Sequence, residues 1–264
     1  MSTGEDAGNG GSGSESKYAQ YDGQAIDRLK AFGLLSGDEK TELAKMALPR
    51  RTVERGEAIR EIGKESASLF LLLEGWAASA ITFPDASRQL TSVSLPGDLL
   101  GLPSLSVVEP IDTLLALSKV VVCDIPAANF AEMFTNMPRL ATILFLVSQE
   151  ERMLAMERLA LIGRASAASR LAAFVLRLHE RLGQGLDEAP MSFSLPLTQV
   201  EIGDLIGISA VHVNAVLKQA RERNIMSIRS RELHILDFNA LVETAGVQPW
   251  QRADPSWLKS SKST

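Results

Sequence analysis

The stretch Leu197–Met226, LTQVEIGDLIGISAVHVNAVLKQARERNIM, constrains the fold more than any other part of the chain. Thr198 and Glu201 have the T-x-x-E spacing of a capping box, so a helix is predicted to begin here. Gly207 permits a tight turn, and Ser209 is a favourable N-cap for a second helix. Two short helices joined in this way are typical of a helix-turn-helix, whose second helix enters a DNA major groove. On these residues alone, an ordinary helical hairpin stays open as the alternative.

Both predicted helices carry apolar residues at helical spacing, which predicts one buried face on each. The apolar residues assigned to these faces are Val200, Ile202, Leu205 and Ile206 in the first helix and Val213, Val216 and Leu217 in the second. The candidates for the outward face of the second helix are Ala210, Val211, His212, Asn214, Ala215 and Lys218.

A polar hairpin is predicted directly after the second helix. Residues 226–237 alternate as two short strands around a turn near residues 229–232, in the place of the wing of a winged helix-turn-helix. From Ser209 to Arg231 there are five cations and one acid, a local net charge of +4 on a chain whose net charge is −5. The cations are Lys218, Arg221, Arg223, Arg229 and Arg231. A basic island on an acidic chain favours contact with DNA phosphates.

In the middle of the chain, the spacing of apolar residues changes from that of helices to that of strands. From about Arg51 to Ile125, short apolar runs alternate with turn signals such as Pro96-Gly97-Asp98. Many short strands at this spacing predict an antiparallel barrel or jelly roll. Upstream, residues 24–46 have helical spacing with breaks at Gly33 and Ser36, which predicts two short helices.

A long helix is predicted from Pro138, a favourable first helical residue, to about Ile162. A seven-residue ladder along it favours a dimer helix; its residues are Leu140, Ile143, Val147, Leu154 and Leu161. The alternative is a helix packed on its own domain. A second amphipathic helix over 165–182 is predicted to pack under the helix-turn-helix, and Asp237 and Gly246 bound a last helix over 238–244.

Composition excludes several classes of protein. One cysteine, Cys123, is too few for a disulfide framework or an iron–sulfur cluster, and the three isolated histidines lack metal-ligand spacing. We therefore expect no cofactor and no metal. We also expect no enzyme activity, because paired carboxylates, a nucleophile–base arrangement and a phosphate loop are all missing. No apolar run reaches transmembrane length, so a cytoplasmic protein is expected. Residues 1–20 have the composition of a disordered tail.

Four sequence segments in this order resemble the CRP/FNR family of bacterial transcription regulators: LFLLLEGWA, SRQLTSVSLPGDLLGLPSL, LIGRASAASRLAAFVLRL and VEIGDLIGISAVHVNAVLK. The resemblance covers roughly residues 24–240. It implies an α+β chain with a cyclic-nucleotide-binding-like N-terminal barrel, a long dimerisation helix and a C-terminal winged helix-turn-helix. It also implies a homodimer that binds an inverted repeat in double-stranded DNA and contacts RNA polymerase.

The resemblance assigns DNA contact to the second helix of the motif and to the basic segment that follows it. The implied contact residues are Thr198, Ser209, Ala210, Val211, His212, Asn214, Ala215, Lys218, Arg221, Arg229 and Arg231. Relatives place an arginine where this chain has Ala215, so a contact worth ~1–3 kcal/mol is missing.

The effector site departs from the family as well. Cyclic-AMP-binding members carry Gly-Glu-Leu and, about ten residues later, an arginine for the phosphate. Here these places read Gly101-Leu102-Pro103 and Asp112. A carboxylate would repel the phosphate, so cyclic AMP is not expected to bind through the usual contacts. The candidates for an effector pocket are Gly97, Gly101, Leu102, Asp112 and Thr113.

We therefore expect a tail over 1–20, a sensor barrel over 21–137, a dimerisation helix over 138–163, a DNA-binding domain over 164–240 and an extension over 241–264. The leading hypothesis is a DNA-binding transcription regulator with an unidentified small-molecule or protein effector and no membrane partner. The rival is a protein-interaction regulator that keeps the fold but has weak or lost DNA binding.

Overall fold

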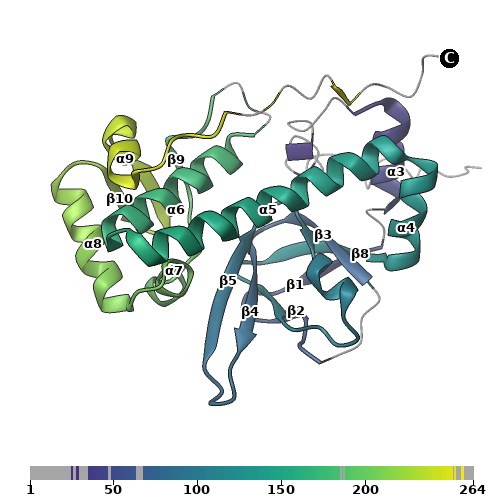
Figure 1. Ribbon diagram of the computed structural model, residues 1–264, viewed down its shortest axis with the longest axis horizontal. Coiled ribbons are helices and arrows are strands. Elements are labelled where there is room, and N and C mark those ends of the chain that lie inside the picture. Colours follow the sequence, from purple (N-terminus) through teal and green to yellow (C-terminus); the bar gives the residue numbers. More distant parts are fainter. Residues whose placement is uncertain are drawn as a thin grey trace, which may run out of the picture.

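The computed structural model describes residues 35–46, 49–63, 68–184, 186 and 188–251, together with Ala25, Arg28, Leu29, Ala253, Trp257 and Leu258. The predicted tail over 1–20 lies outside the described residues, as does most of the first predicted helix. A β-rich part and a helical part lie side by side, and the long helix α5 crosses both of them (Figure 1).

The β-rich part consists of two four-stranded antiparallel sheets. One has the order β1 (Arg50–Val53), β8 (Val120–Pro126), β3 (Ser68–Glu74) and β6 (Leu99–Leu100). The other has the order β2 (Ala58–Arg60), β7 (Thr113–Ala116), β4 (Ala77–Thr82) and β5 (Arg88–Ser94). The predicted antiparallel barrel is confirmed.

Strand β3 explains why the run LFLLL is apolar at every position. Leu69 and Leu71 pack in a cluster with residues of α5, whereas Phe70 and Leu72 pack between the two sheets. A strand buried on both faces loses the usual alternation of apolar and polar residues. Cys123 of β8 is fully buried, and burial raises the pKa of its thiol to about 11.

Short helices flank the barrel. Helix α3 (Gly37–Met46) was predicted, and the 3-10 helix η1 (Leu102–Ser106) follows β6. Helix α4 (Ala127–Asn136) was not predicted and occupies the end of the segment assigned to the barrel. Phe130, Met133 and Phe134 have helical spacing along it, although Met133 is its only buried residue.

Helix α5 (Pro138–Arg164) begins at the predicted proline. Leu140, Ile143 and Val147 are at most 2% exposed and pack against the barrel and the N-terminal residues, and burial of each stabilises the fold by about 1.5–3 kcal/mol. Leu154 and Leu161 line a cavity inside the chain. Three residues of the predicted dimer ladder therefore pack within their own chain, whereas Leu154 and Leu161 are half-buried, and dimerisation through this ladder stays a prediction.

The opposite face of α5 is the one that a second molecule could reach. Phe145, Met156 and Leu159 are 50%, 62% and 73% exposed. Arg152 lies seven residues after Phe145, and from Arg152 through Met156 and Leu159 to Gly163 the steps are four, three and four residues, which is the spacing of a helix seam. Helix α5 therefore carries two rows of regularly spaced residues. One row faces its own chain, and the other is exposed.

The helical part contains α6 (Ala167–Leu182), α7 (Gln199–Ile206), α8 (Ala210–Glu222) and α9 (Phe238–Ala245). A three-stranded antiparallel sheet has the order β10 (Met226–Arg229), β11 (Glu232–Ile235) and β9 (Ser192–Ser194). Ser166 caps α6 by accepting a hydrogen bond from the Ser169 backbone N–H, and α6 packs on α9 and α8. The predicted wing and last helix are confirmed, and β9 adds a third strand to the wing.

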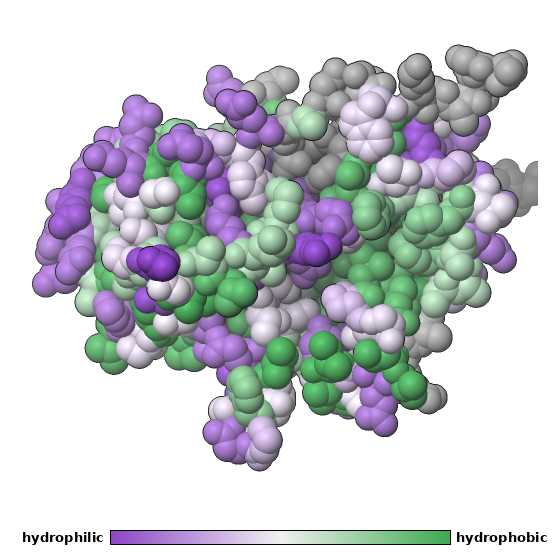
Figure 2. Space-filling view, in the orientation of Figure 1, coloured by the Kyte–Doolittle hydropathy of each residue, from purple (hydrophilic) through white to green (hydrophobic). Residues whose placement is uncertain are grey.

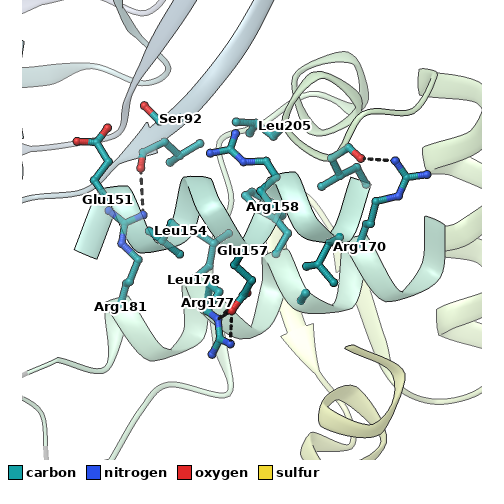
Figure 3. Close-up of a pocket in the computed structure, with 15 residues that line it drawn as sticks. Ser92, Glu151, Leu154, Glu157, Arg158, Arg170, Arg177, Leu178, Arg181 and Leu205 are labelled. Atoms are coloured by element: carbon teal, nitrogen blue, oxygen red, sulfur yellow. Dashed lines mark hydrogen bonds and ion pairs between the residues drawn. The ribbon is translucent and has the colours of Figure 1, made fainter. Parts of the chain in front are cut away.

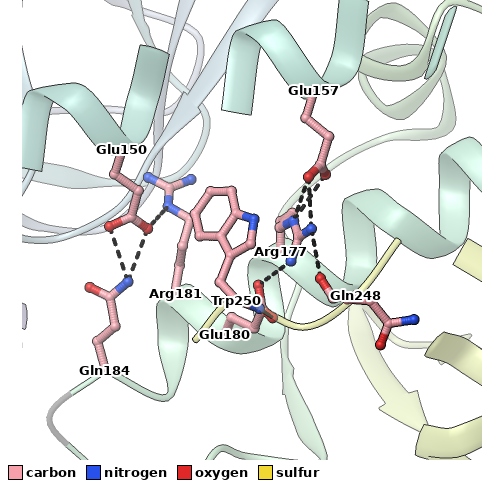
Figure 4. Close-up of polar contacts among 8 residues, drawn as sticks. All are labelled: Glu150, Glu157, Arg177, Glu180, Arg181, Gln184, Gln248 and Trp250. Atoms are coloured by element: carbon pink, nitrogen blue, oxygen red, sulfur yellow. Dashed lines mark hydrogen bonds and ion pairs between the residues drawn. The ribbon is translucent and has the colours of Figure 1, made fainter. Parts of the chain in front are cut away.

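Buried polar contacts connect the two parts. Arg181 of α6 forms an ion pair of 2.6 Å with Asp98 of the barrel and donates to the Val93 carbonyl at 3.0 Å. Gln184 donates to Glu150 of α5 at 3.0 Å (Figure 4). Charged groups that are buried in pairs fix one relative orientation, because separating them leaves each one unpaired.

A second contact joins the barrel to the first helix of the helix-turn-helix motif. Arg55, in the turn between β1 and β2, donates to the Glu201 carboxylate at 3.1 Å and to the Pro196 carbonyl at 2.6 Å. The Gln89 side chain donates to the carbonyl of Asp204. The barrel therefore holds α7 at both of its ends.

Candidate nucleic-acid interface

The caps of α7 and α8 match the sequence prediction. Thr198 Oγ1 accepts from the Glu201 N–H at 3.2 Å, and the Glu201 carboxylate accepts from the Thr198 N–H at 2.6 Å. Ser209 Oγ accepts from the His212 N–H at 3.3 Å. One otherwise free N–H in the first turn of each helix is therefore satisfied, which marks where each helix begins.

The turn between α7 and α8 depends on two glycines. Gly207 has φ of 71°, a left-handed conformation that disfavours residues with a Cβ, as predicted. Gly203 was missed: a Cβ there would lie 2.4 Å from the Ile208 carbonyl oxygen. A glycine inside a predicted helix was the available signal, because such a residue often marks a close approach of backbone.

Helix α8 buries one face and exposes the other. Val213, Val216 and Ala220 are at most 6% exposed. Of the predicted contact residues on α8, Ala210 is half-buried. The others are exposed: Val211, His212, Asn214, Ala215, Lys218 and Arg221. Val200 of α7 was expected to be buried and is 61% exposed, because it lies on the outer side of this short helix.

A groove of about 520 Å³ lies between the start of α7, helix α8 and the wing. It brings together five of the predicted contact residues: Thr198, Asn214, Lys218, Arg221 and Arg231. Gln199 and Ser227 also line it and were missed, because neither residue type stands out in a polar segment. Arg229 does not line this groove and borders a neighbouring hollow on the other side of Arg221.

The wing turn has an unusual backbone. Ser230 and Arg231 both have positive φ, 51° and 62°. Two left-handed residues make the type of turn that matches the twist of a hairpin, although non-glycine residues adopt it at a cost of about 1 kcal/mol or more. The turn presents Arg231 to the groove.

The five cations of the basic island are all exposed. Of these five, Lys218 alone lies within 4 Å of a carboxylate of a described residue, Glu222 at 3.9 Å, and both side chains are largely solvated. Hydrophilic side chains gather over the side of the molecule that carries α8, whereas apolar side chains follow the course of α5 (Figure 2). The outer face of α8 and the wing can therefore contact phosphates.

The barrel position expected to hold an effector contains an internal ion pair. Arg60 of β2 bonds to Asp112 and donates to Ser104 Oγ at 3.0 Å, and its side chain is only 3% exposed. Gly101 has φ of 86°, and a Cβ there would lie 2.8 Å from the Arg60 guanidinium. The sequence argument missed Arg60, because it lies 52 residues from Asp112 along the chain.

The other effector candidates are dispersed. Thr113 Oγ1 accepts a hydrogen bond from the Ile62 backbone at 3.2 Å. Leu102 packs with the cluster around α5, and Gly97 lies against Ala25 and Arg28. Of the five predicted residues, the structure brings only Gly101 and Asp112 together around one polar group.

Two family models match this chain. The Crp-like helix-turn-helix domain matches residues 169–244, and the cyclic nucleotide-binding domain matches residues 50–137. The Fumarate and nitrate reduction regulatory protein of Yersinia pestis is 26% identical over 222 residues, covering 84% of this chain and 88% of that protein. Electron transport regulator A of Shewanella oneidensis is 26% identical over 212 residues, covering 80% and 84%.

The chain belongs to the CRP/FNR family of transcription regulators. Two solved structures have the same fold. FixK2 from Bradyrhizobium japonicum superposes with a TM-score of 0.66 at 20% identity, covering 75% of this chain and 98% of that one. A CRP-family transcriptional regulator from Thermus thermophilus gives 0.61 at 20% identity, covering 76% and 98%. The relatives are regulators, which agrees with the prediction that this chain is not an enzyme.

Among the described residues, no helix is by itself long and apolar enough to span a membrane; the bent pair α7–α8, with 94° between its members, passes that test on length and composition only. The same residues contain no group of three or more histidine, cysteine or acidic side chains that could hold a metal ion.

Proposed function

We propose that this family member binds a specific inverted-repeat sequence in duplex DNA as a homodimer and regulates transcription there, in the cytoplasm, through contact with RNA polymerase. The observation that carries the proposal is the outer face of α8, where Asn214, Lys218 and Arg221 border the groove of the wing. The major groove admits a helix of this kind, and the caps of α7 and α8 fix its orientation.

On this face, some side chains suit contact with DNA phosphates and others suit recognition of bases. Lys218, Arg221, Arg229 and Arg231 supply cations for phosphates. Asn214 can pair with adenine, and the exposed aliphatic side chain of Val211 can contact thymine methyl groups. Ala215 cannot donate a hydrogen bond, so specificity rests on fewer polar contacts than in relatives with arginine at this position.

Dimerisation is supported by the exposed face of α5. Phe145, Met156 and Leu159 form an apolar stripe on a helix of 27 residues. A second copy packed against this stripe about a two-fold axis would give the dimer two α8 helices, one from each protomer. Half-sites about one helical turn apart, roughly 34 Å, suit such a two-fold arrangement.

The barrel is proposed not to bind cyclic AMP through the usual contacts. The guanidinium that could attract a phosphate is present in Arg60, but Asp112 and Ser104 already bond to it inside the barrel. A phosphate would have to displace a buried ion pair, which is costly. An effector of this protein is therefore proposed to bind at a place other than this barrel position, or to be a protein.

Selection of DNA from a random library at low salt, followed by a mobility-shift assay with the dimer confirmed by light scattering, tests the DNA proposal. We expect enrichment of one inverted repeat. Binding that shows no sequence preference would contradict the proposal.

Ala215 favours a second candidate function, the protein-interaction regulator with weak or lost DNA binding. The substitution Ala215→Arg adds a donor on the exposed face of α8 and is expected to strengthen specific binding by ~1–3 kcal/mol. A rise from a measurable baseline supports the first function. Specific binding that appears only in the variant supports the second.

A further inference from the structure

A cavity lies where the barrel, α5, α6 and α7 meet. Its volume is about 70 Å³, room for about five waters at 10–15 Å³ each. Its walls come from Val93 of β5, Leu154 and Leu161 of α5, Phe174 of α6 and Leu205 of α7. Figure 3 labels Leu154 and Leu205 among them. Both parts of the molecule, including the first helix of the DNA-binding motif, therefore contribute to one apolar enclosure.

Four arginines line this cavity, and three of them are engaged. Arg170 donates to the Ile206 carbonyl at 3.0 Å, Arg177 pairs with Glu157 at 2.7 Å, and Arg181 pairs with Asp98 at 2.6 Å. Arg158 has no hydrogen bond and no ion pair within the part of the chain that the structure describes.

Arg158 therefore keeps its hydrogen-bonding capacity in a partly buried position. Burial lowers the pKa of its guanidinium, and the Glu151 carboxyl is the nearby charge that opposes this effect. Burial also raises the pKa of Glu151 more than the adjacent Ser92 hydroxyl lowers it. An apolar pocket with a few convergent polar groups of shifted pKa is the usual form of a small-molecule site.

We infer that this junction cavity binds a small amphipathic anion, such as a short-chain carboxylate, with its carboxylate on Arg158 and its hydrocarbon among Leu154, Leu161 and Phe174. Arginine binds carboxylates through two parallel hydrogen bonds, and a desolvated arginine gains most from such a partner. The apolar walls supply the rest of the affinity through burial of the hydrocarbon.

The position of the cavity gives the ligand a regulatory role, which rests on the proposed function. Leu205 and Ile206 lie in α7, and Val93 lies in the barrel strand β5. A ligand that touches both changes the free energy of one arrangement of the two parts relative to any other. Because the barrel's own site holds the Arg60–Asp112 pair, the junction replaces it as the place where an effector acts.

Calorimetric titration of the full chain without DNA tests the site. The probes are hexanoate, hexanol as its uncharged match, and inorganic phosphate as an anion without hydrocarbon. We expect hexanoate to bind at least tenfold more tightly than hexanol and phosphate not to compete. Equal binding of hexanoate and hexanol, or no binding of hexanoate, overturns the inference.

Two variants locate the binding. Arg158→Gln should remove the preference for hexanoate and leave hexanol binding unchanged, which also shows that the cavity is intact. Arg164→Gln, a matched change at an exposed arginine of the same helix, should keep the preference. Leu154→Trp should fill the cavity and abolish binding of both six-carbon probes. The site is overturned if Arg158→Gln and Arg164→Gln lose the preference for hexanoate equally. It is also overturned if Leu154→Trp binds both six-carbon probes as the wild-type protein does.

Coupling to DNA is measured separately. Saturating hexanoate should change the affinity of the wild-type protein for its selected DNA at least twofold, and should not change that of Arg158→Gln. An unchanged affinity overturns the regulatory role. Hexanoate binding in a protein that shows no specific DNA binding overturns the proposed function and leaves the site standing.

Discussion

His179 lies on α6, is 7% exposed, and has its ring 5.0 Å from that of Phe238. Burial lowers the pKa of the imidazole below its ordinary 6.5. Between the folded and unfolded pKa values the unfolded chain binds the proton and the folded chain does not. The stabilising contribution of neutral His179 is therefore complete above pH 6.5 and is lost as pH falls below it.

We predict that the free energy of unfolding falls more steeply between pH 8 and pH 5.5 in the wild-type protein than in His179→Gln. Urea titrations at both pH values measure this difference. Gln219→Ala, an exposed change that removes no ionisable group, serves as the control and should keep the wild-type pH dependence. An unchanged pH dependence in His179→Gln would show that this histidine does not govern acid stability.

At the scale of elements, the capping box determines the start of α7. Thr198→Ala removes the hydrogen bond to the Glu201 N–H and is expected to lower the free energy of unfolding by ~1 kcal/mol. Urea unfolding followed by circular dichroism measures this. Gln199→Ala, an exposed change next to the cap, should cost much less; equal losses in both variants would contradict the role of the cap.

The two faces of α5 lead to a prediction about assembly. Leu159→Glu places a charge on the exposed stripe and should weaken dimerisation more than ~10-fold, because two carboxylates would be buried together across the two-fold axis. Val108→Glu changes a side chain of the barrel that is 82% exposed and should leave the dimer intact. Analytical ultracentrifugation distinguishes them, and a stable Leu159→Glu dimer would contradict the proposed seam.

At the scale of the whole molecule, DNA affinity should depend steeply on salt, although the chain is acidic with a net charge of −5. Each phosphate neutralised contributes ~0.9 to the slope of log affinity against log salt concentration. Lys218→Gln should therefore reduce the slope by ~0.9 for each protomer bound. Fluorescence anisotropy over a salt series measures it, and Lys119→Gln on the barrel should leave it unchanged.

Much of the fold was predictable because its signals are local. The caps at Thr198, Ser209 and Asp237, the proline at the start of α5 and the alternation in the wing each depend on residues a few positions apart. Helix α4 was missed because the sequence analysis assigned the whole segment up to residue 137 to the barrel. The candidate contacts on α8 were predictable for the same local reason, whereas the groove that collects five of them with Gln199 and Ser227 required the packed wing.

The sequence by itself determined the class of this protein: the order of barrel, long helix and winged helix-turn-helix, and the basic face on an acidic chain. Tertiary structure decided which side of α5 is free, that Arg60 occupies the barrel site with Asp112, and that Arg158 lines a cavity shared by both parts. The physical reason is distance along the chain. Caps and periodicity act within a few residues, whereas burial and ion pairing depend on residues that only folding brings together.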